Sequence, residues 1–101
     1  MFARINWGKI HAGDWDKFES KFKEIVAEAG PQPGLKGRML CRDINNPDTG
    51  FALSFWETEK DMRNYETSDT MQNLVLPAME PFLPGEYNTT FVEVLHNEVD
   101  M

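Results

Sequence analysis

Hydrophobic residues follow a two-residue period in four stretches of the chain and a helical period between them, and this order leaves few folds open. The alternating stretches, each predicted to be a strand, are Phe2–Lys9, Leu35–Asp43, Phe51–Trp56 and Tyr87–Leu95. The chain therefore predicts the order strand, helix, strand, strand, helix, strand. We expect an α+β protein of the ferredoxin-like type, a four-stranded antiparallel sheet with two helical segments on one face.

The first helical stretch has the clearest pattern. Apolar side chains recur along one helix face from Trp15 to Ala29, and Asp14 precedes them as a good N-cap. Gly30 and Pro31 predict the end of this helix, because glycine readily adopts the left-handed conformation of a helix cap and proline cannot continue the hydrogen-bond ladder.

The second helical region is divided. Thr58 and Asp61 resemble a capping box and predict a short helix through Tyr65. A further helical stretch covers residues 71–82, and we expect its two prolines to bend it, because each removes an amide donor. The third strand is apolar on both faces, which predicts a central place in the sheet.

Size and charge exclude several classes of protein. The chain has 101 residues and a mass of 11.7 kDa, so we expect a single domain over residues 1–101. Its formal net charge is −7 and its sequence pI is about 4.7. These values oppose binding to nucleic acid and to anionic membrane surfaces, because both require clustered Lys and Arg.

Cysteine and histidine usage points to a cytoplasmic protein without a metal site. Cys41 is the one cysteine of the chain, so no intrachain disulfide can form, and we expect a buried structural thiol. The first residues lack the long apolar run of a signal peptide or membrane span. His11 and His96 lack the spacing of metal ligands.

Strand parity collects a large apolar surface on one face of the predicted sheet, which we expect to be the face that the helices leave open. Its members are Phe2, Leu40, Trp56, Phe91 and Leu95. A single protomer has no third layer to cover so much apolar surface. We therefore expect a homodimer that packs two sheets face to face and hides Trp56 and Phe91.

The same parity aims four polar or amphipathic side chains at that face. They are Asn6, Arg38, Ser54 and Trp56, and Tyr65 can join them from the short helix. From the residues alone two interpretations stay open: these side chains fill a dimer interface, or they form a ligand site.

Three stretches of the chain, in their order, resemble the antibiotic biosynthesis monooxygenase family. They are Pro33–Asp43, Asn46–Gly50 and Ser54–Asp61. The most specific pieces are the Pro-Gly-hydrophobic start of the second strand and the Trp-Glu-Thr-Glu junction that leads from the third strand into the helix. The resemblance implies a dimeric α+β barrel with one cavity per protomer between sheet and helices. Better-known members oxygenate phenols or quinols without flavin or metal, and some relatives degrade haem.

Matching the chain to the haem-degrading branch makes haem degradation the less favoured activity. Asn6 matches the asparagine that those enzymes carry on the first strand. Aligned on Trp56, Tyr65 stands where that branch has a second tryptophan, and Val75 stands where it has the histidine that ligates iron. The quinol-oxygenating members often have a histidine where Tyr65 falls, and tyrosine is better suited to hydrogen bonding than to base catalysis.

The resemblance and the residues together predict a cofactor-independent monooxygenase that acts on a small aromatic substrate of phenol or hydroquinone type. Asn6 and Tyr65 are the expected catalytic residues. Arg38, Ser54 and Trp56 are the expected substrate-binding residues, with Trp56 stacking on the ring. We expect no cofactor and no metal. The alternatives are a non-catalytic module of the same fold, which binds a small molecule or only dimerises, and an accessory chain of another enzyme.

Overall fold

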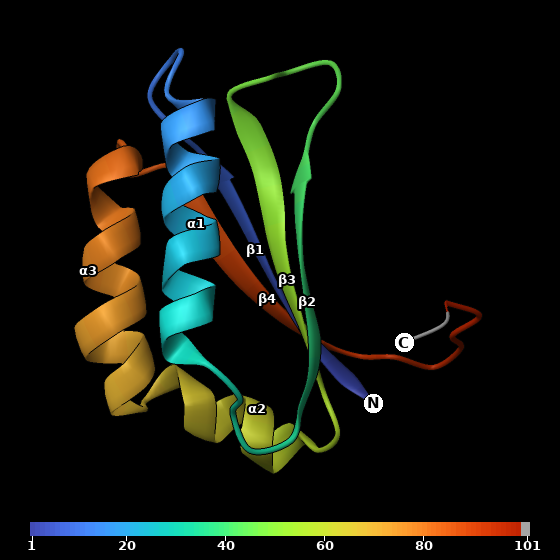
Figure 1. The fold of residues 1–101 in the computed structure, drawn as a ribbon. Coiled ribbons are helices and arrows are strands. Elements are labelled where there is room, and N and C mark those ends of the chain that lie inside the picture. The colour runs from blue at the N-terminus through green and yellow to red at the C-terminus, as the bar shows by residue number, and fades with distance from the viewer. Residues whose placement is uncertain (100–101) are drawn as a thin grey trace.

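Four antiparallel strands form one sheet, and the helices cover one of its faces (Figure 1). The computed structural model describes residues 1–99. The elements are β1 (Phe2–Lys9), α1 (Trp15–Ala29), β2 (Leu35–Arg42), β3 (Thr49–Trp56), α2 (Glu59–Glu66), the π-helix η1 (Thr70–Val75), α3 (Leu76–Met79), the 3₁₀-helix η2 (Glu80–Phe82) and β4 (Tyr87–Glu93). The strand order is β2-β3-β1-β4, so β3 is central as predicted. The predicted ferredoxin-like α+β fold is confirmed.

Helix α1 has the predicted bounds, but its first cap differs from the prediction. Gly30 follows the helix with φ 66°, the left-handed region that favours glycine. Asp14 precedes the helix with φ −93° and ψ 4°, and its side chain makes no cap hydrogen bond. An N-cap residue usually has an extended backbone, which brings its side chain to the first free amides. The predicted capping role of Asp14 is therefore wrong.

Helix α2 begins as the sequence predicts. Thr58 has an extended backbone, and its Oγ1 accepts a hydrogen bond from the Asp61 amide at 3.1 Å. This bond satisfies one of the free amides of the first turn and fixes where the chain leaves β3. The helix thereby carries Tyr65 over the end of the sheet.

The predicted single bent helix over residues 71–82 is instead three consecutive helices of different type. The π-helix η1 closes with the Leu76 amide bonded to the Met71 carbonyl. Pro77 then stands in the first turn of α3 and Pro81 lies in η2, and neither has an amide hydrogen to donate to the preceding turn. The prolines therefore change the helix type rather than only bend one helix.

Two strands end earlier than predicted. β2 stops before Asp43, whose carboxylate instead accepts a hydrogen bond from the Asn45 amide at 2.8 Å and shapes the following turn. β4 stops before Leu95, which is 86% exposed and belongs to no apolar face of the sheet. Of the predicted polar tail over residues 97–101, the last two positions lie outside the described residues.

The register shows which side chains share the helix-covered face. Ser54 on β3 lies between Arg38 on β2 and Arg4 on β1. Asn6 lies in the next row, opposite Ala52 on β3. All of these residues line a cavity between sheet and helices. The prediction that Asn6, Arg38 and Ser54 lie on the open face is wrong, although the prediction that they share a face is confirmed.

Trp56 belongs to the same covered face. It is 1% exposed and packs with Met62 of α2, Tyr65 and Met71, and Phe91 packs against this cluster. The predicted dimer face carrying Trp56 and Phe91 is therefore wrong, because α2 and η1 already cover it within one protomer. Parity separates the two faces of a strand but does not say which one the helices cover.

The opposite parity forms the open face of the sheet, a name we keep for Ile5, Trp7, Met39, Cys41, Phe51, Leu53 and Phe55. Met39 and Phe51 are each 38% exposed. Cys41 is exposed as well, so the expected burial of its thiol is wrong for the protomer, because no helix lies over this face.

Candidate functional site

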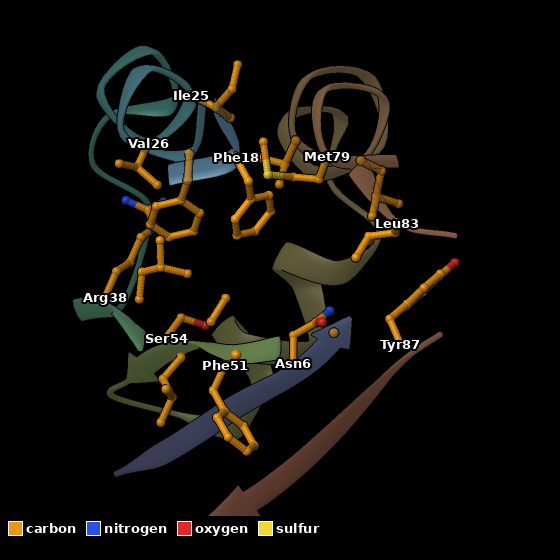
Figure 2. Close-up of a pocket in the computed structure, with 18 of the residues that line it drawn as sticks. Asn6, Phe18, Ile25, Val26, Arg38, Phe51, Ser54, Met79, Leu83 and Tyr87 are labelled. Atoms are coloured by element: carbon orange, nitrogen blue, oxygen red, sulfur yellow. The ribbon is translucent and has the colours of Figure 1, made fainter. Parts of the chain in front are cut away.

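A cavity of about 120 Å³ lies between the sheet and the helices. Strands β1, β2 and β3 form its floor, and α1, η1 and α3 form its roof. Figure 2 shows Phe18, Ile25 and Val26 of α1 and Met79 of α3 above the cavity, with Asn6 and Ser54 below. The family resemblance implies a cavity in this place.

Small residues line the floor and let the covering side chains approach it closely. Gly8, Gly50 and Ala52 all line the cavity, and Gly8 lies directly opposite Gly50 in the register. A Cβ on Gly50 would stand 2.6 Å from the Trp15 ring, and one on Gly8 would stand 3.1 Å from Leu83. Trp15 and Leu83 therefore pack directly on the strand backbone at this end of the cavity.

The roof is apolar and aromatic. Phe18 packs against Trp15 with 5.4 Å between ring centroids and meets Phe82 edge-on at 5.7 Å. Phe22 and Val26 continue the same face of α1 along the cavity. Such walls keep the local dielectric low, which strengthens any hydrogen bond or ion pair that a ligand makes with the floor.

The polar groups of the floor are held by their neighbours. The Asn6 side-chain amide donates to Thr89 Oγ1 at 3.1 Å across the β1–β4 pair, which leaves its carbonyl oxygen and second N–H for a ligand. The Ser54 Oγ accepts from Trp56 Nε1 at 2.9 Å, which leaves the hydroxyl proton of Ser54 to donate. Asn6 points into the cavity from β1 (Figure 2).

Trp56 is not one of the residues within 1–99 that line the cavity, but it contacts two that do, Ser54 and Tyr65. Besides its bond to Ser54, its ring lies 5.0 Å from the Tyr65 ring at an interplanar angle of 40°. Tyr65 is 8% exposed and does line the cavity. The structure thus brings Asn6, Arg38, Ser54 and Tyr65 together and places Trp56 outside, so the expectation that Trp56 stacks on a substrate ring is not supported.

The two arginines of the floor differ in their partners. Arg4 forms an ion pair with Glu66 of α2. Arg38 forms none, and its Nη2 atom is buried without a hydrogen-bond partner among residues 1–99. The sequence did not lead us to predict Arg4 as a cavity residue. Strand parity could have identified it, because Arg4 lies on the same face of β1 as Asn6.

The opening of the cavity was also missed. Glu80 and Tyr87 line the cavity and are exposed, Tyr87 to 49%, so the cavity meets solvent there. Figure 2 shows Tyr87 and Leu83 at this side. No pattern in the sequence marks these residues, because η2 and the start of β4 meet only in the folded chain.

Histidine and metal-binding groups are not part of this cavity. Val75 lines it, and no histidine does so within residues 1–99. His96 is exposed and lies 2.9 Å from Glu98 on the polar tail. The described part of the chain holds no group of three His, Cys, Asp or Glu side chains that could bind a metal ion.

Two carboxyl groups have shifted pKa values, and both lie outside this cavity. The pKa of Glu19 is lowered mainly by a hydrogen bond from Lys23 and by a second one from Trp15. The pKa of Asp43 is lowered mainly by a hydrogen bond from the Asn45 backbone amide. Neither group can supply acid or base chemistry to a ligand in the cavity.

Fold and cavity together define a small α+β protein with a mainly apolar cavity between its sheet and its helices. The chain belongs to the antibiotic biosynthesis monooxygenase family, whose model matches residues 1–75. No curated protein sequence matches the chain. Between residues 1 and 99, no helix combines the length and the hydropathy that crossing a membrane requires.

Solved structures share this fold at low sequence identity. SnoaB, a cofactor-independent oxygenase from Streptomyces nogalater, aligns with a TM-score of 0.79 and 15% identity over 98% of this chain and 97% of its own. A candidate antibiotic biosynthesis monooxygenase from Bordetella bronchiseptica aligns with a TM-score of 0.81 and 17% identity, over 94% and 97% of the two chains. A conserved protein from Methanosarcina mazei aligns with a TM-score of 0.76 and 15% identity, over 90% and 89%.

Proposed function

We propose that this protein is a cofactor-independent monooxygenase whose cavity takes a small aromatic substrate of phenol or hydroquinone type. Family membership supports the class of reaction, and a cofactor-independent oxygenase has the same fold. The single observation that carries the proposal is the cavity, with apolar walls around a few polar side chains. A module that only dimerised would not need this space, and large apolar side chains would fill it.

The proposed reaction inserts one oxygen atom into the substrate. A phenol and O₂ give a quinone and water: one oxygen atom replaces a ring hydrogen, the other leaves as water, and the ring supplies all the electrons. The phenol first loses its proton to water, and the phenolate then transfers an electron to O₂. The two radicals combine into a ring peroxide anion, which takes up a proton to give the hydroperoxide, and loss of water from the hydroperoxide gives the quinone.

The polar groups of the floor would favour the charged species in this sequence. The Asn6 amide is fixed by Thr89 and can donate its second N–H to the phenolate oxygen. The Tyr65 hydroxyl can hold a second oxygen of the substrate, as in a hydroquinone. Between apolar walls such preorganised donors lower the barrier more than they would in water. Trp56 acts as a positioning residue, since it holds Ser54 and packs on Tyr65.

We also propose that the protein is a homodimer, formed through the open face rather than through Trp56. Apart from Lys9 at the end of β1, the strand side chains of that parity are uncharged, in a chain in which 27% of the residues are charged. A face of this kind on the central strands requires cover, and a second copy offers an identical apolar surface. We expect an interface above about 1,000 Å². The exposed thiol of Cys41 would be covered in this dimer, and we place the protein in the cytoplasm, where thiols stay reduced.

Oxygen uptake with a panel of phenols and hydroquinones tests the proposed activity, each rate being taken against spontaneous oxidation in buffer. We expect Asn6→Ala and Tyr65→Phe to lower the rate by about 10²- to 10³-fold, because each removes a hydrogen-bond donor to the substrate oxygens. Asn64→Ala is the matched control, since Asn64 is exposed on α2 beside Tyr65.

The control variant should react at the wild-type rate. Wild-type rates no faster than buffer would favour the non-catalytic binding module, and so would Asn6 and Tyr65 variants that react as fast as the wild type. Co-purification with a second enzyme would instead favour the accessory chain.

A further inference from the structure

Arg38 differs from every other arginine of this protein. Arg4 pairs with Glu66, and Arg63 pairs with Glu59 and lies 4.6 Å from the centre of the Phe91 ring. Arg42 lies 5.6 Å from the centre of the Trp15 ring. Arg38 has no ion pair or ring contact among residues 1–99, and its buried Nη2 has no hydrogen-bond partner there.

A buried guanidinium nitrogen without a partner is costly, because it has lost its water and gained no acceptor. The surroundings of Arg38 cannot supply an acceptor of opposite charge. The cavity-lining side chains of α1 are aromatic or aliphatic, and Figure 2 shows Arg38 beneath Val26. Glu66 is already engaged by Arg4, and Glu80, the one carboxylate among residues 1–99 that lines the cavity, is exposed at the opening. In the free cavity the buried Nη2 of Arg38 is therefore a charged donor without an acceptor among residues 1–99.

The neighbours of Arg38 add donors rather than acceptors. Ser54 lies directly opposite Arg38 in the register, and its Oγ already accepts from Trp56, so its proton is free to donate. An arginine beside a hydroxyl donor is the arrangement that binds a carboxylate, whose two oxygens accept from both. Figure 2 shows Asn6 on the other side of Ser54, which separates a carboxylate position from the position proposed for the phenolic oxygen.

The size of the cavity limits the ligand to one ring. Its volume is about 120 Å³. An apolar protein cavity of about 150 Å³ is sufficient to hold benzene. A fused ring system would have to extend toward the opening beside Tyr87.

We infer that the cavity binds a single-ring aromatic acid, with its carboxylate on Arg38 and Ser54. This inference deepens the proposed function and rests on it for the reaction, since a hydroxylated benzoate would place its phenol toward Asn6. Carboxylate binding itself requires no turnover and is measured separately.

Calorimetric titration with benzoate and with benzamide, its neutral analogue of the same size, tests the inference. We expect benzoate to bind at least about tenfold more tightly than benzamide and than 2-naphthoate. Arg38→Met should weaken benzoate binding by about 10- to 100-fold and change benzamide binding by less than about threefold, because only the carboxylate uses the charge. Arg42→Met is the matched control, an exposed arginine on the same strand and face, and should bind benzoate as the wild type does.

The melting temperature of the ligand-free protein distinguishes this role from a merely structural one, because loss of a structural arginine would lower it. Removing an unpaired buried charge should leave the Tm of Arg38→Met unchanged or raise it. A lowered Tm, or equal affinity for benzoate and benzamide, would overturn the inference.

Oxygen uptake then separates the two claims. If benzoate binds through Arg38 but neither hydroxybenzoates nor hydroquinones are oxidised, the oxygenase proposal fails and carboxylate recognition stands. If hydroquinone is oxidised and benzoate binds no more tightly than benzamide, the activity stands and the inference about Arg38 is overturned.

Discussion

The two faces of the sheet are formed by the same strands but differ in polarity and in how far the protomer covers them. The helix-covered face carries Arg38, Ser54 and Asn6 around a cavity, and the buried Nη2 atom of Arg38 has no hydrogen-bond partner within residues 1–99. The open face carries uncharged side chains such as Trp7 and Phe51 and has no cover within the protomer. The first face encloses a cavity with an unpartnered hydrogen-bond donor, whereas the second leaves an apolar surface uncovered.

This contrast shows that hydrophobicity does not decide which face of a sheet the helices cover. The covered face holds both arginines of the central row, and it works as a core because Met62 and Met71 enclose Trp56 at one end. At the other end Trp15 rests on Gly50. The space between these two packed ends is the cavity.

The largest expected effect comes from two matched tryptophan variants, one on each face. Trp56→Ala should lower the free energy of unfolding by about 3 to 5 kcal/mol, because it empties a fully buried site and frees the Ser54 hydroxyl. Trp7→Ala should cost less, and its cost should grow with protein concentration, because this side chain serves the proposed dimer. Urea unfolding at two protein concentrations measures both changes.

The opposite result would break the comparison. If Trp56→Ala kept its stability but dissociated a dimer, the covered face would be the assembly surface after all.

A smaller effect is expected from a charge on the open face. Phe51→Glu should raise the dissociation constant of the dimer by about 100-fold, because a carboxylate would enter an apolar interface and lose its water. The fold should survive, since Phe51 is 38% exposed in the protomer. Ile44→Glu is the matched control, because Ile44 is 95% exposed in the turn that follows β2.

Sedimentation velocity across a dilution series gives the two dissociation constants. A wild-type monomer at micromolar concentration would remove the dimer proposal, and equal dissociation constants for Phe51→Glu and the wild type would move the interface to another surface.

Local patterns predicted most of the fold. The stripe from Trp15 to Ala29 and the threonine cap at Thr58 act over a few residues, so the sequence shows them directly. The helix types around Pro77 could not be foreseen, because a missing donor can be accommodated in several ways.

The sequence predicted which residues lie together at the site but not on which face of the sheet they lie. Asn6, Arg38 and Ser54 share a face because strand side chains alternate, and that rule needs no structure. Whether helices lie over that face depends on long-range packing, which strand parity does not contain. The Arg4–Glu66 pair joins β1 to α2, and the opening at Glu80 and Tyr87 joins η2 to β4, so both depend on contacts between distant segments.

Four methionines serve as reporters, two at the cavity, one on the open face and one in the core. Met71 and Met79 line the cavity, Met39 lies on the open face, and Met62 is buried beside Trp56 as an internal reference. Methyl NMR spectra of methyl-labelled protein, titrated with hydroquinone in the absence of oxygen, therefore test the central claim that the covered face binds the ligand.

We predict that hydroquinone shifts the Met71 and Met79 signals and leaves Met39 in place, whereas dilution of the protein shifts Met39 alone. Ala52→Leu, which fills the cavity floor, should abolish the ligand response, and Ala27→Leu on the exposed side of α1 should keep it. A ligand response at Met39 with none at Met71 and Met79, or no response at millimolar hydroquinone, would contradict the account.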